Sequence, residues 1–201
     1  MSRTRLILAS ASPRRAALLD QLGARYTREP AHIDEAQHMD ESPPDYVQRI
    51  AQDKARAVGL RFPPPVYVVL AADTTVVLDG SVLGKPQDEE QAMATLSRLS
   101  GRKHTVLTAV CLLSGEGMQC EVVETEVEFA TLSEAVCRAY LATGEPWDKA
   151  GAYGIQGLGG AFVRSIRGSY SNVVGLPLSE TWQLLGAHGV ATTLTPAAST
   201  G

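Results

Sequence analysis

The chain has 201 residues, and its 44% hydrophobic content is enough to bury the core of one domain, which argues against a fibrous or disordered class. Its 18 basic and 22 acidic residues give a net charge of −4, so no overall charge draws it to nucleic acid or to an anionic membrane. No apolar run approaches the roughly 20 residues that span a bilayer, and the N-terminus has no signal-peptide pattern. We therefore expect a cytoplasmic protein without a nucleic-acid or membrane partner.

The first predicted elements are a strand, a polar turn and a helix. An apolar run at residues 6–9 precedes the sequence Ser-Ala-Ser-Pro-Arg-Arg at residues 10–15. Ser12 suits the N-cap of a helix, Pro13 suits its first turn, and Gly23 suits the left-handed conformation that ends a helix.

Two hydroxyls and two arginines therefore lie at one predicted helix N-terminus: Ser10, Ser12, Arg14 and Arg15. The free N–H groups and the dipole of such a terminus favour an anion, and a guanidinium binds phosphate oxygens in pairs. These residues predict a phosphate-binding site. The alternative is a surface capping motif with solvated arginines, because the segment is not a Walker loop.

A short strand at residues 24–30 and an acidic loop at residues 33–44 come next, followed by a helix predicted over residues 43 to about 60. Lys54 falls on the apolar stripe of that helix. Because an unpaired buried ammonium is costly, we expect Lys54 either to meet a carboxylate or phosphate, or to extend to the surface.

The run Val-Tyr-Val-Val-Leu-Ala-Ala at residues 66–72 is typical of a central strand that is covered on both faces. Asp73 follows it, and we expect this carboxylate where the strand leaves the sheet, the usual place for ligands in α/β proteins. The alternative is that Asp73 only caps the next turn. A hairpin with a type I′ turn at Asp79-Gly80 is predicted over residues 75–83.

The rest of the chain is expected to complete a single domain at residues 1–190. In chain order we predict a helix at 88–99 ended by Gly101, antiparallel strands at 104–113 and 121–129, a helix from Ser133 to about 143, a glycine-rich loop at 151–160, a strand at about 161–166 and a helix at 178–185. Residues 191–201 are predicted to form a loose tail.

Metal-ligating patterns are few. Cys111, Cys120 and Cys137 are odd in number and form no CxxC pair, which argues against a disulfide framework or a zinc site, and we expect them to be small core or strand residues. The histidines show no metal-ligand spacing. Glu35 is the candidate second carboxylate, beside Asp73, for a divalent ion that also binds substrate phosphates. The alternative for Glu35 is a solvated charge in a loop.

Two further polar positions lie next to glycines. Lys85 stands between Gly84 and Pro86, where its charge can reach over the sheet edge. Residues 148–157 combine adjacent opposite charges with a glycine-rich path and Gln156, whose amide can both donate to and accept from a base edge. The alternative for this segment is a merely flexible loop.

An ordered set of motifs between residue 6 and about residue 185 resembles the Maf family of nucleoside triphosphate pyrophosphatases, which is linked with septum formation. The motifs are Ser-x-Ser-Pro-Arg-Arg at 10–15, Asp-Glu at 34–35, Tyr-Val-x-Arg-Ile-Ala-x-x-Lys-Ala at 46–55, Ala-Asp-Thr at 72–74, Gly-Lys-Pro at 84–86, Ser-Gly-x-x-His-x-Val-x-Thr at 100–108, Asp-Lys-Ala-Gly-Ala-Tyr-Gly-Ile-Gln-Gly at 148–157 and Val-Gly-Leu-Pro at 174–177.

This resemblance implies an α/β fold with a central mixed β-sheet flanked by helices and two lobes around a nucleotide cleft, similar to the inosine triphosphate pyrophosphatases. It implies hydrolysis between the α- and β-phosphates, a divalent cation (Mg²⁺, Mn²⁺ or Co²⁺) and a homodimer. Lys54, Lys85 and the arginines at the first helix would offset the triphosphate charge. Asp73 would be the general base or a metal ligand, and Glu35 the second ligand or the base; the sequence leaves these assignments open.

Three positions bear on the base of the nucleotide. Members of the family that act on 7-methyl-GTP resemble this chain but place Trp, Gln and Glu where it has Arg14, Thr74 and Gln156. A glutamine amide can donate to and accept from the O4 and N3–H edge of uracil or thymine. The resemblance therefore implies dTTP and UTP as substrates, with 5-methyl-UTP, pseudo-UTP and 5-methyl-CTP in the same pocket.

Two other functions fit the same motifs. One is a nucleotide-binding regulator of cell division with little turnover, and the other is a house-cleaning pyrophosphatase for inosine or xanthosine triphosphate. Replacing Asp73 distinguishes the first, because a regulator would keep its effect on division. A ranking of substrates distinguishes the second.

Overall fold

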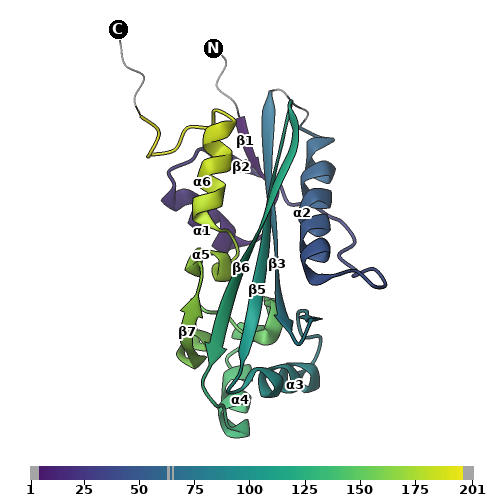
Figure 1. Ribbon diagram of the computed structural model, residues 1–201, viewed down its shortest axis with the longest axis vertical. Coiled ribbons are helices and arrows are strands. Elements are labelled where there is room, and N and C mark those ends of the chain that lie inside the picture. The colour runs from purple at the N-terminus through teal and green to yellow at the C-terminus, as the bar shows by residue number, and fades with distance from the viewer. Residues whose placement is uncertain (1–4, 63, 65, 197–201) are drawn as a thin grey trace.

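The structure is a computed structural model that describes residues 5–62, 64 and 66–196. Within that part, one mixed sheet has the strand order β2-β1-β3-β5-β6-β7, and β4 pairs with β3 (Figure 1). β1 lies parallel to β2 and β3, whereas the other pairs are antiparallel. The strands are β1 (Arg5–Leu8), β2 (Tyr26–Arg28), β3 (Tyr67–Leu78), β4 (Ser81–Leu83), β5 (Lys103–Ser114), β6 (Gly117–Phe129) and β7 (Val163–Arg167). The predicted mixed sheet flanked by helices is confirmed.

Helices cover both faces of the sheet because successive side chains of a strand point to opposite faces. In β1, Leu6 and Leu8 pack with α1 (Pro13–Gln21) and α6 (Leu178–Ala187), while Ile7 packs with α2 (Pro43–Gly59). Figure 1 shows α2 on one side of the long strands and α1, α5 (Tyr170–Val174) and α6 on the other.

A second hydrophobic cluster fills the opposite end of the sheet. There α3 (Glu89–Leu99), α4 (Glu134–Leu141) and the short 3-10 turns η2 (Ala150–Ala152) and η3 (Leu158–Phe162) contribute to one cluster with Phe129, and η1 (Glu145–Asp148) contacts α4 and η2. The first cluster is the one in which Leu6 and Leu8 pack with α1 and α6. β3 and β5 run through both clusters, with Leu70 and Leu112 in the first and Val76 and Val106 in the second. The two ends of the molecule therefore share their central strands.

The predicted helix starts and turns are confirmed. Four of the predicted helices begin at a side chain that accepts a hydrogen bond from a backbone N–H in the first turn, namely Ser12, Ser42, Asp88 and Ser133. Asp79 and Gly80 both have positive φ, as a type I′ turn requires.

The predicted break in β3 is wrong. The strand continues from Tyr67 to Leu78, so Asp73 does not lie where the strand leaves the sheet. The polar pair Asp73 and Thr74 remains in the strand because each side chain has polar partners on its own face. The strand β6 begins at Gly117 rather than at residue 121, and the short helix α5 was not predicted.

The expectation that the cysteines form no disulfide is also wrong for one pair. Cys111 and Cys120 are disulfide-bonded across β5 and β6, with their Cα atoms 4.1 Å apart. The two strands bring them together because the hairpin pairs position 111 with position 120. Both lie in strands, as expected, and Cys137 is a free, buried residue of α4.

Two loop predictions need correction. The glycine-rich segment at 151–160 contains parts of η2 and η3 rather than open loop alone. The predicted loose tail begins as a packed segment, because Thr192 is buried and the Thr193 N–H donates to the Leu22 carbonyl at 2.8 Å. Residues 197–201 of that tail lie outside the described residues. No helix in the described part of the chain is long and apolar enough to cross a membrane.

Candidate active site

A gap in the sheet opens along one edge of β3. β1 pairs with β3 as far as Leu70, and β4 pairs with it from Val76 onward. Between these points, the strand pairing of Asp73 and Thr74 within the described residues is with β5 alone. Ligands of α/β sheets bind where neighbouring strands diverge in this way. The free edge of β3 borders a cavity of about 460 Å³, a size typical of small-molecule sites.

All ten residues singled out in the sequence line this cavity: Ser10, Ser12, Arg14, Arg15, Glu35, Lys54, Asp73, Thr74, Lys85 and Gln156. They come from four regions of the chain: the first turn of α1, the acidic loop with α2, the middle of β3 with the segment after β4, and the turn after η2. The fold thus brings the predicted residues together.

The start of α1 forms the cationic end of the cavity. The Oγ of Ser10 accepts a hydrogen bond from the Ser12 N–H at 3.1 Å, and the Oγ of Ser12 accepts one from the Arg15 N–H at 3.4 Å. Arg14 reaches across to Asp148 with an Nη1 to Oδ2 distance of 3.0 Å. Because the positive end of a helix and two guanidiniums meet here, the geometry suits an anionic group.

Arg15 is fixed against β3 by two hydrogen bonds. Its Nε donates to the Gly175 carbonyl at 2.8 Å, and its Nη2 donates to Thr74 Oγ1 at 3.0 Å. Burial lowers the pKa of Arg15 from its ordinary value, although Asp73 opposes the shift. Gly175 has a φ of 125°, a backbone conformation that residues with a side chain rarely adopt, which favours glycine at this position.

Lys54 joins two carboxylates on the other face of β3. Its Nζ lies 2.7 Å from Asp73 Oδ1 and 2.7 Å from Glu35 Oε1. Of the two expectations for Lys54, the structure therefore shows contact with carboxylates rather than extension to the surface. Asp73 and Thr74 are adjacent in a strand and point to opposite faces, which is why one meets Lys54 and the other meets Arg15.

Glu35 is ionised at neutral pH. Burial raises the pKa of this carboxyl, but the hydrogen bond from Lys54 and the positive charges of Lys54, Lys85 and Arg15 outweigh burial and leave the pKa below its usual value. The cations of the cavity thus keep a negative charge on the acidic loop.

Glu145 organises the segment that carries Gln156. Its Oε2 accepts from the Leu158 N–H at 2.8 Å and its Oε1 from the Gly159 N–H at 3.1 Å. Oε1 also accepts from the hydroxyl of Tyr140 at 2.8 Å. The turn that bears Gln156 is therefore held by one carboxylate rather than being freely flexible.

The further residues that line the cavity include Tyr46, Asp148 and Tyr153. Tyr46 was not selected from the sequence, although it lies eight residues before Lys54 and so on the same helical face. Asp148 and Tyr153 belong to the glycine-rich motif, where the adjacent opposite charges and a tyrosine among glycines were the signal, but neither was selected as a site residue.

The described residues hold no group of three or more His, Cys, Asp or Glu side chains that suits a metal ion. Asp73 and Glu35 nevertheless face one cavity and share one ammonium. Mg²⁺ commonly takes one or two protein carboxylates and completes its coordination with water and substrate phosphates, so this donor set fits such an ion.

Residues 5–188 match the family described as Maf-like protein. The dTTP/UTP pyrophosphatase of Methylobacillus flagellatus is 51% identical over 188 residues, which cover 94% of each chain. That of Anaeromyxobacter dehalogenans is 56% identical and covers 92% of this chain and 94% of its own. That of Yersinia pestis is 54% identical and covers 94% of both chains. Among solved structures, the Staphylococcus aureus Ham1 protein aligns at 13% identity with a TM-score of 0.44, over 63% of this chain and 72% of that one.

Proposed function

Since this chain belongs to the Maf-like protein family, we propose that it hydrolyses dTTP and UTP to the nucleoside monophosphate and pyrophosphate. The observation that carries the proposal is the cavity at the free edge of β3, where cations for a triphosphate, two carboxylates and a base-reading amide lie together. Relatives that are 51%, 56% and 54% identical over the aligned residues are named for this activity.

Phosphate binding is assigned to the cationic side chains and to the start of α1. Arg14, Arg15, Lys54 and Lys85 all line the cavity, so they can offset the charge of a triphosphate. The hydroxyls of Ser10 and Ser12 lie at the same helix terminus. The charge of pyrophosphate as it leaves would be stabilised by the same cations.

Asp73 is the proposed general base. A water molecule attacks the α-phosphorus, and its oxygen forms the new P–O bond. Its proton passes to the Asp73 carboxylate while the bond between the α- and β-phosphates breaks. Lys54 fixes this carboxylate by a contact of 2.7 Å. Pyrophosphate takes the electron pair of the broken bond and leaves.

A divalent cation is proposed as the cofactor, with Asp73 and Glu35 as its protein ligands. When bound, Mg²⁺, Mn²⁺ or Co²⁺ would polarise phosphoryl oxygens and neutralise part of their charge. The assignment in which Glu35 is the base and Asp73 is only a ligand remains the alternative within this proposal.

Base selection is assigned to Arg14, Thr74 and Gln156. A glutamine amide offers a donor and an acceptor to uracil or thymine, and 5-methyl-UTP and pseudo-UTP present the same pyrimidine edge. The homodimer and the cytoplasmic location stay predictions from the sequence.

Pyrophosphate release by the purified protein tests the proposal, with dTTP, UTP, CTP, GTP, 7-methyl-GTP and ITP as the panel and Mg²⁺ or Mn²⁺ present. We expect metal-dependent release from dTTP and UTP, and a kcat at least about 100-fold lower for Asp73→Asn, because proton transfer to a positioned base contributes that much. The control is Asp79→Asn. Asp79 lies in the exposed turn between β3 and β4, and its carboxylate pairs with Arg102.

Each other result has a definite meaning. Preference for 7-methyl-GTP or ITP would keep the reaction but reject the roles of Arg14, Thr74 and Gln156. Equal rates for Asp73→Asn and the unchanged chain would reject Asp73 as the base. No release from any nucleotide would favour the regulator of cell division.

A further inference from the structure

Glu35 reaches the cavity from the acidic loop, which in the structure ends at residue 42, where α2 begins, and has no helix or strand over residues 33–42. Its side chain is 43% exposed and meets Lys54 at 2.7 Å. A carboxylate on an irregular loop keeps a fixed position only if other contacts hold its backbone. In this protein those contacts come from α2.

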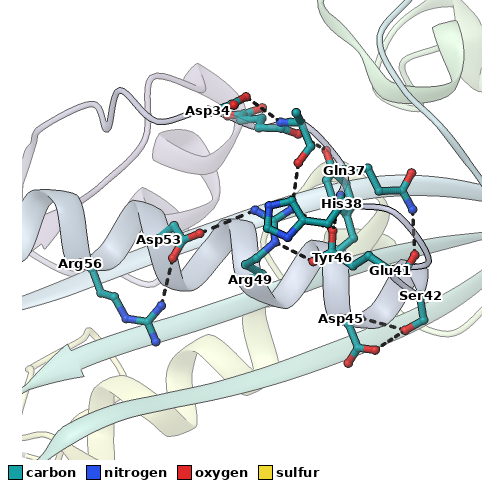
Figure 2. Close-up of polar contacts among 12 residues, drawn as sticks. Asp34, Gln37, His38, Glu41, Ser42, Asp45, Tyr46, Arg49, Asp53 and Arg56 are labelled. Carbon is teal, nitrogen blue, oxygen red and sulfur yellow. Dashed lines mark hydrogen bonds and ion pairs between the residues drawn. The ribbon is translucent and has the colours of Figure 1, made fainter.

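Arg49 of α2 binds the acidic loop at two places. Its Nε and Nη2 donate to the two carboxylate oxygens of Glu41 at 2.6 and 2.8 Å. Its Nη2 also donates to the Ala36 carbonyl at 2.9 Å. Figure 2 shows the guanidinium lying between α2 and the loop. A two-pronged guanidinium–carboxylate contact fixes direction as well as distance.

Tyr46 adds a third contact from the same face of α2. Its hydroxyl donates to the Glu35 carbonyl at 3.0 Å, and the Arg49 guanidinium lies 5.8 Å from the centre of its ring (Figure 2). The carbonyls of two successive loop residues, Glu35 and Ala36, are therefore both bound by side chains of one helix.

Glu41 also ties the loop to itself. Its Oε2 accepts from the His38 N–H at 3.1 Å, and its carbonyl accepts from Gln37 Nε2 at 2.9 Å. Its side chain is only 10% exposed. Because Glu41 joins both the turn and Arg49, loss of either partner of this pair removes the ion pair that ties the turn to α2 and leaves fewer contacts to hold the loop.

We propose that Arg49 is a positioning residue for Glu35, which it holds beside Lys54 and Asp73 by clamping the acidic loop to α2. The role rests on the proposed function, since it concerns the same cavity. The described lining of the cavity includes Glu35 and Tyr46 but neither Arg49 nor Glu41, so these two affect the reaction through the loop.

The competing explanation is that Arg49 only stabilises α2, because its Nη1 also lies 3.7 Å from Asp53 one turn away. Kinetics separate the two. For Arg49→Met and for Glu41→Gln we expect kcat with dTTP to fall at least about tenfold, with KM within about twofold, because displacement of a reacting group costs rate more than binding. Glu41→Gln leaves α2 intact and so remains informative if Arg49→Met folds poorly.

The matched control is Arg56→Met. Arg56 lies on the same helix and pairs with Asp53 and Gln52 rather than with the loop, so we expect its kcat and KM to stay within about twofold of the unchanged chain. A second test uses Glu35→Gln. If Arg49 acts through Glu35, adding Arg49→Met to that variant lowers kcat by less than about twofold more. An equal loss in both backgrounds, or a change in KM alone, would overturn the proposal.

Hydrogen exchange of the amides of residues 34–42 tests the clamp without turnover. We expect faster exchange there in Arg49→Met and Glu41→Gln but not in Arg56→Met. Unchanged exchange would overturn the proposal even if the chain hydrolyses dTTP. If the unchanged chain releases no pyrophosphate, the proposed function fails by itself, and the exchange result still decides whether the clamp exists.

Discussion

His104 shows how a single buried side chain makes stability depend on pH. It packs edge to face on Phe129 and Tyr153, and its Nε2 lies 2.9 Å from the Tyr153 hydroxyl. Its Nδ1 is buried with no hydrogen-bond partner among the described residues. Burial lowers the pKa of His104 to about 4, so the imidazole is neutral at pH 7.

The unfolded chain should hold a proton on this residue that the folded chain does not, between the ordinary pKa of 6.5 and about 4. We therefore expect the free energy of unfolding to fall as the pH is lowered through this window, by on the order of 3 kcal/mol from His104. Urea unfolding at a series of pH values measures the effect.

His104→Gln should flatten that part of the pH dependence, since it removes the titrating ring. His188→Gln is the control, because His188 is only partly buried and bonds to Gln119, outside the hydrophobic cluster that contains Phe129. A slope that persists unchanged in His104→Gln would show that carboxylates, and not this imidazole, set the dependence.

For Lys54, the sequence predicts the kind of partner but not which residues provide it. Its place on an apolar stripe predicts an anionic partner, because a lone buried ammonium is costly. The identity of the partners does not follow, since Glu35 comes from an irregular loop and Asp73 from a strand. Asp73 itself was predicted at a strand end because the apolar run stops there, whereas Lys54 compensates its charge inside the strand.

At the level of elements, the segment from η1 to η3 depends on Glu145. Its carboxylate collects two backbone N–H groups and the Tyr140 hydroxyl. A Cβ atom at Gly157 would lie 2.3 Å from Glu145 Oε2, so the turn approaches this carboxylate closely at a glycine. The turn and Glu145 therefore form one unit.

Glu145→Ala leaves those donors without an acceptor, and each unpaired donor lowers the free energy of unfolding by on the order of 1 kcal/mol. Because Gln156 lies in the same turn, we expect the KM for dTTP to rise about tenfold, with a smaller change in kcat. Steady-state kinetics measures this. The control is Glu134→Ala, which removes an exposed pair with Arg138 on α4. A lower melting temperature with an unchanged KM would limit Glu145 to a structural role.

The sequence contains more information about the β5–β6 hairpin than the cysteine count suggests. A two-residue turn pairs Ser114 with Gly117, and counting back along both strands pairs Cys111 with Cys120. Counting cysteines ignored this register and so missed the disulfide. The short turns between 145 and 162 have no hydrophobic periodicity, which is why no pattern predicted them.

At the scale of the whole molecule, the two hydrophobic clusters share β3 and β5. We therefore expect residues 1–190 to unfold as one unit, as the sequence predicts. Leu19→Ala in one cluster and Leu99→Ala in the other should each lower stability by about 2–5 kcal/mol, and each should shift a single urea transition.

Trp147 in η1 and Trp182 in α6 report on opposite ends of the molecule. Each leucine variant is combined in turn with Trp147→Phe and with Trp182→Phe, so that one tryptophan remains to report by fluorescence. For a given leucine variant, we expect both tryptophans to give the same midpoint of urea unfolding. Separate midpoints at the two ends would show two independently unfolding lobes.

The layers of this fold follow from the sequence, and the sheet order does not. The continuous apolar runs in β1 and β3 predict strands covered on both faces. That β1 lies between β2 and β3 depends on which face each connecting helix crosses, and no local pattern records that choice. The gap beside β3, which creates the cavity, depends on the sheet order.

The opposite facing of Asp73 and Thr74 in β3 also limits how the gene can change in length. Inserting or deleting one codon between Tyr67 and Asp73 would turn every later side chain of the strand to the other face, exchanging the groups that meet Lys54 and Arg15. Lineages that descend from this chain are therefore expected to vary along this strand by substitution alone.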